Sequence, residues 1–145
     1  MIKRSKGNKK VRNATPTSVK RNGTTIKFRS KLEKYCFEQL ELAGIQAKYE
    51  PVALELMPKF RYGEPGNEEA VRKITYTPDF IIPSGIIECK GFANDAFPIK
   101  WKILKWCLYM KKKKTKLYIV KNQTQVRELI KQIKNEQVHK LSPNN

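Results

Sequence analysis

The chain has 145 residues, enough for one domain with a buried core, and its 31 Lys and Arg against 13 Asp and Glu give a formal net charge of +18. This excess predicts a polyanionic partner. Nucleic acid ranks ahead of an anionic membrane, because no long apolar stretch or signal-peptide core is present. The single histidine, His139, argues against Ser-His-Asp, Cys-His and His-rich zinc chemistry, so any catalysis must rest on carboxylates, lysine and an oxygen-ligated metal.

Residues 1–26 are predicted to form a flexible basic arm. Residues 1–31 hold 11 Lys or Arg and no acid, which leaves +7 for the rest of the chain (18 − 11 = 7). The arm has little apolar periodicity, as is typical of a segment that cannot bury a core. We therefore expect one folded domain over residues 27–140.

Order is expected to begin near Phe28 with a helix that Ser30 can cap and Gly44 can end. The apolar face of this helix is formed, at helical spacing, by Leu32, Cys36, Leu40 and Ala43. Alternating apolar residues then indicate one or two strands over residues 45–56. Residues 63–67 are predicted to form a turn or loop at the tip of an insertion.

Two further strands are expected over residues 73–82 and 85–91. Pro83-Ser84-Gly85 joins them tightly enough to predict an antiparallel hairpin. Pro98 suits the first turn of a second helix. The apolar stripe of that helix is expected to consist of Ile99, Ile103, Trp106 and Met110.

A short strand over residues 117–120 and a last helix capped by Thr124 complete the expected elements. Their order is helix, three strands, helix, strand, helix. This order predicts the α/β class, in the form of an α+β sandwich with a mixed sheet flanked by helices.

Two acids and a lysine interrupt the otherwise apolar segment 76–91: Asp79, Glu88 and Lys90. Strand alternation puts Glu88 and Lys90 on one face and Cys89 on the other, and a tight hairpin can bring Asp79 beside Glu88. Two carboxylates that close repel each other unless one takes a proton or a cation lies between them. One or two Mg²⁺ or Mn²⁺ ions, bound by both carboxylates and the Cys89 carbonyl, would resolve this repulsion. The alternative, a surface hairpin with an ordinary salt bridge, fits the apolar flanking residues less well.

Pro78-Asp79 and Glu88-Cys89-Lys90 resemble the signature of the PD-(D/E)xK nuclease superfamily. Residues 28–33 (FRSKLE), ahead of a helix, and residues 76–80 (YTPDF) are similar to the phage endonuclease I family of junction-resolving enzymes. Residues 90–102 are similar to related small nuclease-like proteins of phages. The resemblance spans roughly residues 28–105 and implies a restriction-endonuclease-like core.

This resemblance also implies that Glu33 is a further catalytic acid, which reaches the metal from the first helix. Ser30-x-x-Glu33 is equally a helix-capping box, and the two roles are compatible. The resemblance to the endonuclease I family also implies a domain-swapped dimer, in which the first acid comes from the opposite chain. A longer connection between Leu56 and Lys73 departs from that pattern and could keep Glu33 in its own subunit, so a homodimer is left open.

Four basic residues are candidates for holding the DNA backbone: Arg29, Lys100, Lys102 and Lys105. The run Lys111–Lys114 could contact a phosphate, or could equally well provide favourable charge at a helix C-terminus. Trp101 and Trp106, five residues apart, do not share one helix face, so one of them is expected to be exposed. No motif for reading bases is present, which favours recognition of DNA by its shape.

The sequence thus predicts a metal-dependent endonuclease that hydrolyses phosphodiester bonds in branched DNA, such as a Holliday junction. Lys90 would orient the attacking water or neutralise charge on the phosphate. Two alternatives stay open, namely a nicking or end-cutting subunit of a restriction or transposition system, and a basic DNA-binding protein on a nuclease fold that does not cut. Three cysteines, an odd number for disulfides, indicate a cytoplasmic setting, which would be the host cytoplasm for a phage-encoded chain.

Overall fold

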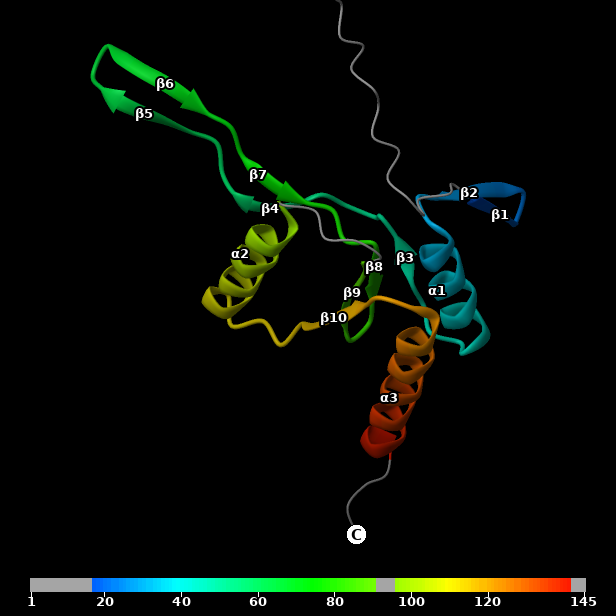
Figure 1. Cartoon of the computed structure of the whole chain (residues 1–145). Coiled ribbons are helices and arrows are strands. Elements are labelled where there is room, and N and C mark those ends of the chain that lie inside the picture. Colours follow the sequence, from blue (N-terminus) through cyan, green and yellow to red (C-terminus); the bar gives the residue numbers. More distant parts are fainter. Residues whose placement is uncertain (1–16, 91–95, 142–145) are drawn as a thin grey trace, which may run out of the picture.

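The structure is a computed structural model that describes residues 17–90 and 96–141. Within these ranges the chain forms three helices and ten strands (Figure 1). The helices are α1 (Lys31–Leu42), α2 (Phe97–Met110) and α3 (Gln123–Leu141). The strands are β1 (Thr17–Arg21), β2 (Thr24–Phe28), β3 (Lys48–Tyr49), β4 (Leu54–Met57), β5 (Phe60–Glu64), β6 (Asn67–Val71), β7 (Ile74–Tyr76), β8 (Phe80–Ile82), β9 (Gly85–Cys89) and β10 (Lys116–Val120). The mixed α and β class predicted from the sequence is confirmed.

The central element is a four-stranded mixed sheet, in which the described strands follow the order β10-β9-β8-β3. β8 and β9 form the antiparallel hairpin predicted around Pro83-Ser84-Gly85. β10 runs parallel to β9, with Lys116 opposite Gly85 and Val120 opposite Cys89. Every residue of β9 is buried, as expected for an inner strand that is covered on both faces.

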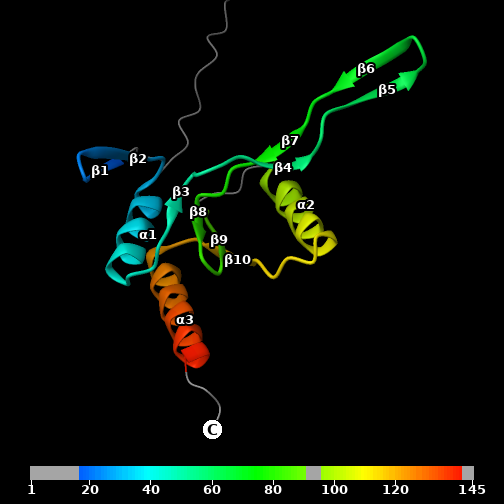
Figure 2. The same cartoon turned by 180° about the vertical axis from the view of Figure 1, so that it is seen from behind.

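Alternation along β9 divides the core into two halves. Ile87 and Cys89 belong to the larger cluster, which contains side chains of α1 and α3, whereas Ile86 belongs to a second cluster with side chains of α2. Figures 1 and 2 show α1 and α3 together on one side of the sheet and α2 apart from them. Leu40 and Ile87 are fully buried, and each such side chain contributes about 2 kcal/mol to stability.

A long antiparallel ribbon lies between β3 and β8 in the sequence. β4 pairs with β7, and β5 continues this ribbon as a hairpin with β6. The turn predicted at residues 63–67 is confirmed as the tip of that hairpin, with Glu64 opposite Asn67. Figure 2 shows the β5–β6 hairpin projecting away from the three helices.

The predicted boundary of the basic arm is wrong for residues 17–26. β1 pairs with β2 from Thr17 opposite Phe28 to Arg21 opposite Thr24. Half-buried Val19 and Ile26 in these strands pack against the core. The short apolar alternation in this hairpin is diluted by lysines and threonines, which is why it resembled an unstructured segment. Residues 1–16 of the predicted arm lie outside the described residues.

The second helix buries a different face from the one predicted. Trp101 and Leu104 are buried, whereas Ile99 is 63%, Trp106 60% and Met110 58% exposed. Both faces of α2 carry apolar side chains, so periodicity alone could not choose between them. The expectation that one of the two tryptophans is exposed is confirmed.

Two boundaries also differ from the prediction. The strand expected over residues 73–82 is two strands, β7 and β8, because the chain leaves one sheet and enters another at Pro78. The last helix is capped by Asn122 rather than Thr124, since Oδ1 of Asn122 accepts a 2.9 Å hydrogen bond from the amide of Gln125. In the described ranges no helix is long and apolar enough to cross a bilayer.

Candidate active site

Asp79 and Glu88 lie side by side at the open end of the β8–β9 hairpin. Phe80 pairs with Ile87, so the next two residues along this ladder are Asp79 and Glu88. The amide of Cys89 donates a 2.7 Å hydrogen bond to Oδ2 of Asp79. Both acids are buried, since Asp79 is 7% and Glu88 4% exposed. The structure therefore brings together the two acids that the sequence singled out.

A break between β7 and β8 sets the position of Asp79. β7 ends at Tyr76 and pairs with β4, whereas β8 begins at Phe80 and pairs with β9. Pro78 has no N–H to offer to a ladder, and it is buried at this break. The carbonyl oxygen of Asp79 accepts a 2.9 Å hydrogen bond from the amide of Glu50, which fixes the backbone at the acid.

Neighbouring side chains hold both carboxylate oxygens of Glu88. The hydroxyl of Tyr76 donates a hydrogen bond to Oε2. Nζ of Lys90 lies 3.1 Å from Oε1 and 4.3 Å from the centroid of the Phe97 ring. The side chain of Lys90 is 23% exposed, so a ligand arriving from solvent can reach it.

Tyr76 and Phe97 were not predicted as site residues. Burial, followed by the hydrogen bond to Glu88, raises the pKa of Tyr76, so this tyrosine remains a hydrogen-bond donor at neutral pH. Strand alternation within residues 73–82 put Tyr76 on the opposite face from Asp79. The strand predicted over residues 73–82 had no break at Pro78. Because β7 ends at Tyr76 and β8 begins at Phe80, alternation does not continue from Tyr76 to Asp79.

Cys89 lies on the opposite face of β9 from Glu88 and Lys90, as predicted. It belongs to the core cluster with Cys36. A hydrogen bond with the Cys36 thiol, followed by burial, raises the pKa of Cys89. Cys36, Cys89 and Cys107 are all free thiols. The thiol of Cys89 therefore belongs to the core, and only its backbone carbonyl is a candidate metal ligand.

The electrostatic environment of Asp79 disfavours its charged form. Burial, followed by the negative charge of Glu88, raises the pKa of Asp79 to about 8. Glu33 raises it further, whereas the amide of Cys89 and the charge of Lys90 act in the opposite direction. One lysine thus does not compensate for the acids around it, and a proton or a second cation is required at neutral pH.

Glu33 lies in the first turn of α1, where its carboxylate is held by two donors. Oε2 accepts a 2.6 Å hydrogen bond from the hydroxyl of Tyr49 and a 3.1 Å hydrogen bond from the amide of Arg29. Oγ of Ser30 accepts a 3.2 Å hydrogen bond from the amide of Glu33, so the capping role of Ser30 is confirmed. In a regular capping box the amide of Ser30 would donate to the Glu33 carboxylate. Here the amide of Arg29 donates instead.

The donor set of Asp79 and Glu88 fits a hard divalent cation. Carboxylate oxygens, completed by waters, are the ligands that Mg²⁺ prefers, and two buried carboxylates are costly unless something positive compensates them. Among the described residues, no group of three or more His, Cys, Asp or Glu is arranged to hold a metal. Glu33 lies near enough for its negative charge to raise the pKa of Asp79.

The raised pKa of Asp79 predicts that the metal-free protein loses stability as the pH rises. The ordinary pKa is 3.8, so between about pH 4 and pH 8 the folded state keeps a proton that the unfolded state has released. The contribution of Asp79 to the free energy of unfolding is fully present below this interval and is lost as the pH rises to about 8. Urea unfolding in chelator at about pH 5 and pH 8.5 should show a larger loss for wild type than for Asp79→Asn. Equal losses would contradict this environment for Asp79.

Three of the four predicted DNA contacts lie on α2, and the fourth, Arg29, lies between β2 and α1. Arg29 precedes α1, is 72% exposed and pairs with Glu50 at 2.8 Å. On α2, Lys100 is half-buried, while Lys102 and Lys105 are exposed. Since α2 begins at Phe97, against Lys90, Lys105 lies roughly 12 Å further along the helix.

Comparison with known families places this site in a wider context. The family described as proteins of unknown function (DUF1064) matches residues 17–127. The chain belongs to this family. The DUF1064 segment runs from β1 into the first turns of α3, so it contains the β1–β2 hairpin and all the candidate site residues. No curated protein and no solved structure matches the chain significantly.

Proposed function

We propose that the protein is a divalent-metal-dependent DNA endonuclease of the PD-(D/E)xK kind. The observation that carries this proposal is the buried pair Asp79 and Glu88 on adjoining strands, with Lys90 3.1 Å from Glu88. The formal charge of +18 supports a nucleic acid as the partner of this site. A cytoplasmic location is part of the proposal, and the three free thiols support it.

The arrangement of elements supports a restriction-endonuclease-like core. α1 precedes β3, β8 and β9, which form a consecutive antiparallel set, and β10 follows α2 and adds in parallel to β9. The acids lie where β8 begins and β9 ends, at the same end of the two inner strands of this sheet. Of the remaining strands between α1 and α2, β4 and β7 carry Leu56 and Tyr76 of the second core cluster, and β5 and β6 form the projecting hairpin.

The residues of the site have separable roles. A divalent cation held by Asp79 and Glu88 would lower the pKa of a coordinated water and offset negative charge on the phosphate. Tyr76 fixes the orientation of the Glu88 carboxylate through its hydrogen bond to Oε2. Lys90 places a positive charge where a phosphate can approach. The ring of Phe97 covers one side of that ammonium and limits its access to water.

The substrate is proposed to be branched DNA, because no base-reading element supports recognition of a sequence. Glu33 of the same chain lies near enough to raise the pKa of Asp79, which supports a site contained within a single subunit. A homodimer would then serve to place two complete sites on two strands, rather than to assemble one site from two chains.

Cleavage of a labelled four-way junction, compared with a linear duplex of the same sequence, tests this proposal. With Mg²⁺ or Mn²⁺ we expect the junction to be cut at a lower enzyme concentration than the duplex, and we expect no cutting in chelator. Equal cutting of both substrates would favour the nicking or end-cutting alternative, and cutting in chelator would contradict metal dependence.

One observation favours a second candidate, a basic DNA-binding protein that does not cut. Tyr76 and Lys90 already occupy both oxygens of Glu88, and the described residues gather no three potential ligands. Such a site could be stabilised by its internal contacts alone. Tight binding to the junction without cleavage in either metal would support this candidate over the enzyme.

A further inference from the structure

The β5–β6 hairpin exposes both of its faces. All five residues of β5 are exposed, and Phe60 is 45% and Tyr62 67% accessible to solvent. A two-stranded ribbon of this kind gains little stability by itself. At its base the hairpin joins the rest of the fold, where β5 follows β4 and β6 continues into β7. The base is therefore the place where one ligand can contact both the hairpin and the rest of the fold.

A basic hollow of about 1110 Å³ lies at the base of the hairpin. Four cationic side chains line it, together with a single acid, Glu55; the cations are Lys59, Arg61, Arg72 and Lys73. Arg61 is engaged with Glu68 at 3.1 Å, whereas within the described residues Arg72 and Lys73 form no ion pair. The hollow therefore carries positive charge that the protein itself does not neutralise.

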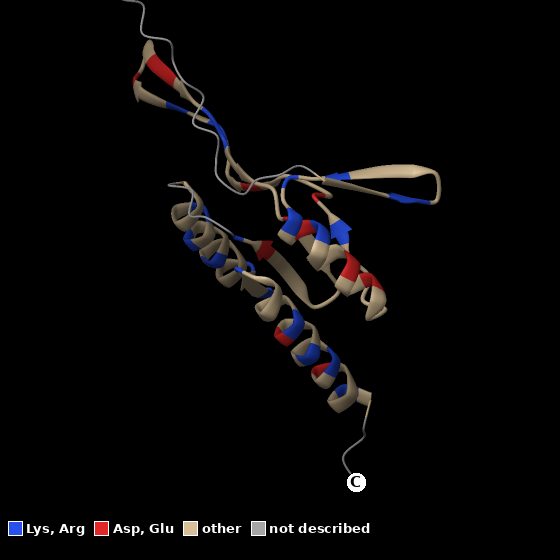
Figure 3. Ribbon diagram, turned by 45° about the vertical axis from the view of Figure 1, so that its right-hand side comes forward, with Lys and Arg blue, Asp and Glu red and all other residues tan. Residues whose placement is uncertain are grey.

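The charge changes sign along the hairpin, which restricts where a polyanion can bind. Three acids lie toward the tip, namely Glu64, Glu68 and Glu69. Figure 3 shows red segments near the tip and blue segments near the base, where the ribbon joins the rest of the fold. A phosphate chain is repelled by the tip and attracted by the base.

The hollow is connected to the candidate active site through β7. Lys73 and Thr75 line the hollow, Tyr76 contacts Glu88, and Asp79 follows three residues later. Asp79 lies six positions after Lys73, which corresponds to at most roughly 20 Å of extended chain. Duplex DNA rises about 3.4 Å per base pair, so this reach covers about six base pairs.

We propose that the hollow at the base of the β5–β6 hairpin binds the phosphate backbone of a duplex arm, up to about six base pairs from the phosphate at Asp79 and Glu88. This inference rests on the proposed function, because it takes the site to be where DNA is cut. The contacts are to phosphates and carry no base information. They give the enzyme a requirement for a duplex arm of minimum length on one side of the cut.

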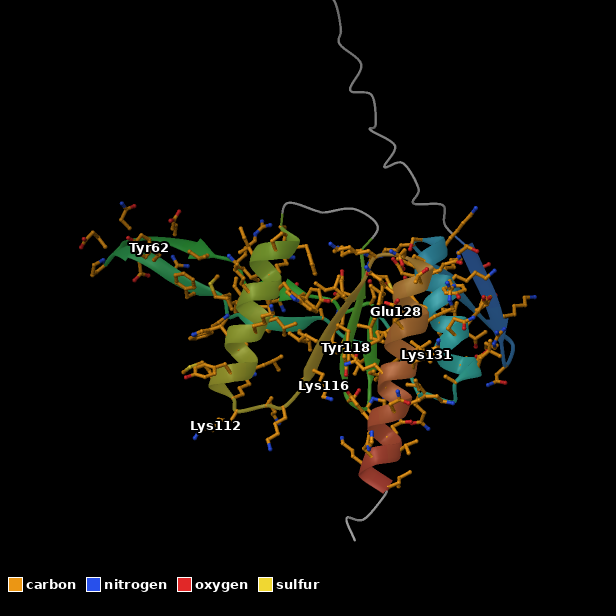
Figure 4. The ribbon with its side chains drawn as sticks, turned by 60° about the horizontal axis from the view of Figure 1, so that its bottom comes forward. Tyr62, Lys112, Lys116, Tyr118, Glu128 and Lys131 are labelled. Carbon is orange, nitrogen blue, oxygen red and sulfur yellow. The ribbon has the colours of Figure 1, made fainter. Side chains whose placement is uncertain are left out.

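The test compares the double variant Arg72→Glu/Lys73→Glu with the charge-matched control Lys131→Glu/Lys134→Glu on α3. Figure 4 shows Lys131 on the opposite side of the molecule from Tyr62 of the hairpin. Fluorescence anisotropy in chelator measures the Kd for junctions with arms of about 4 or 12 base pairs, over a series of salt concentrations. Binding in chelator is independent of cleavage.

For long arms we expect the hairpin variant to bind at least about tenfold more weakly than the control, with a salt dependence lower by the equivalent of about two phosphates. For short arms the two variants should bind equally. Equal losses by both variants on long arms, or a loss by the hairpin variant that does not depend on arm length, would overturn the inference.

Failure of the proposed function has a different signature. If the hairpin variant loses the preference for long arms but wild type never cuts in Mg²⁺ or Mn²⁺, the hollow binds DNA and the nuclease proposal fails. If wild type cuts and the hairpin variant cuts long-arm and short-arm substrates with the wild-type preference, the assignment of the hollow fails alone.

Discussion

Asp79→Asn and Glu88→Gln should each lower the rate of metal-dependent cleavage by about a thousandfold or more. Each substitution replaces a carboxylate of the pair that would bind the cation by a neutral carboxamide, which keeps the shape of the side chain and one of its two acceptor oxygens. The carboxamide oxygen introduced at position 79 can still accept from the amide of Cys89, and the one introduced at position 88 can still accept from Tyr76. Single-turnover cleavage of a junction in Mg²⁺ measures the effect.

Binding of DNA provides the control for these two variants. Both should bind the junction at least as well as wild type, because neither substitution adds negative charge to the site where a phosphate would lie. Glu41 is an exposed acid near the C-terminal end of α1, where it pairs with Arg21 of β1. Glu41→Gln should leave cleavage unchanged. Full activity of either active-site variant would show that the pair is not the metal site.

Gly85→Ala should be among the most destabilising single substitutions in the chain. Gly85 begins β9 and lies opposite Lys116 of β10. A Cβ atom at this position would lie 1.9 Å from the backbone carbonyl oxygen of Lys116, so the two strands would have to separate. We expect the free energy of unfolding to fall by about 3 kcal/mol, as measured by urea denaturation.

Gly44→Ala is the matched control for this effect. Gly44 has a φ of +69°, and a Cβ there would meet nothing within 4 Å. The cost is that of the left-handed backbone alone, about 1 kcal/mol. If the two alanine variants were equally stable, the close parallel pairing of β9 with β10 would be in doubt.

The positions of the acids could be predicted because two local rules agree in the β8–β9 hairpin. Pro83-Ser84-Gly85 specifies a tight connection, and alternation from Gly85 then puts Glu88 and Cys89 on opposite faces. Since the hairpin register follows from the turn, Asp79 had to lie near Glu88. The burial of both acids was predicted from their apolar neighbours.

The partners of the acids could not be predicted, because they come from elements whose packing is decided in three dimensions. Tyr76 reaches Glu88 only because the chain changes sheets at Pro78. Phe97 reaches Lys90 only because α2 buries the face that carries Trp101. That helix is apolar on both faces, and the sequence holds no local signal for which face meets the sheet.

The extent of the fold at the N-terminus was underestimated for a related reason. β1 and β2 contain lysine, arginine and threonine at most of their positions, so apart from Phe28, where order was expected to begin, only Val19 and Ile26 mark their inner face. Two apolar residues seven apart do not reveal a hairpin without the surface that they cover. α1 supplies that surface through the core cluster, and its Glu41 pairs with Arg21.

Binding of Mn²⁺, measured by electron paramagnetic resonance at about pH 8, tests the central claim most directly, because it needs no assumption about the substrate. Wild type should bind one or two ions per chain, and Asp79→Asn and Glu88→Gln should each weaken that binding by about tenfold or more. Glu41→Gln should bind as wild type does. If all four proteins bound Mn²⁺ equally, or if none bound it with or without DNA, Asp79 and Glu88 would not be a metal site.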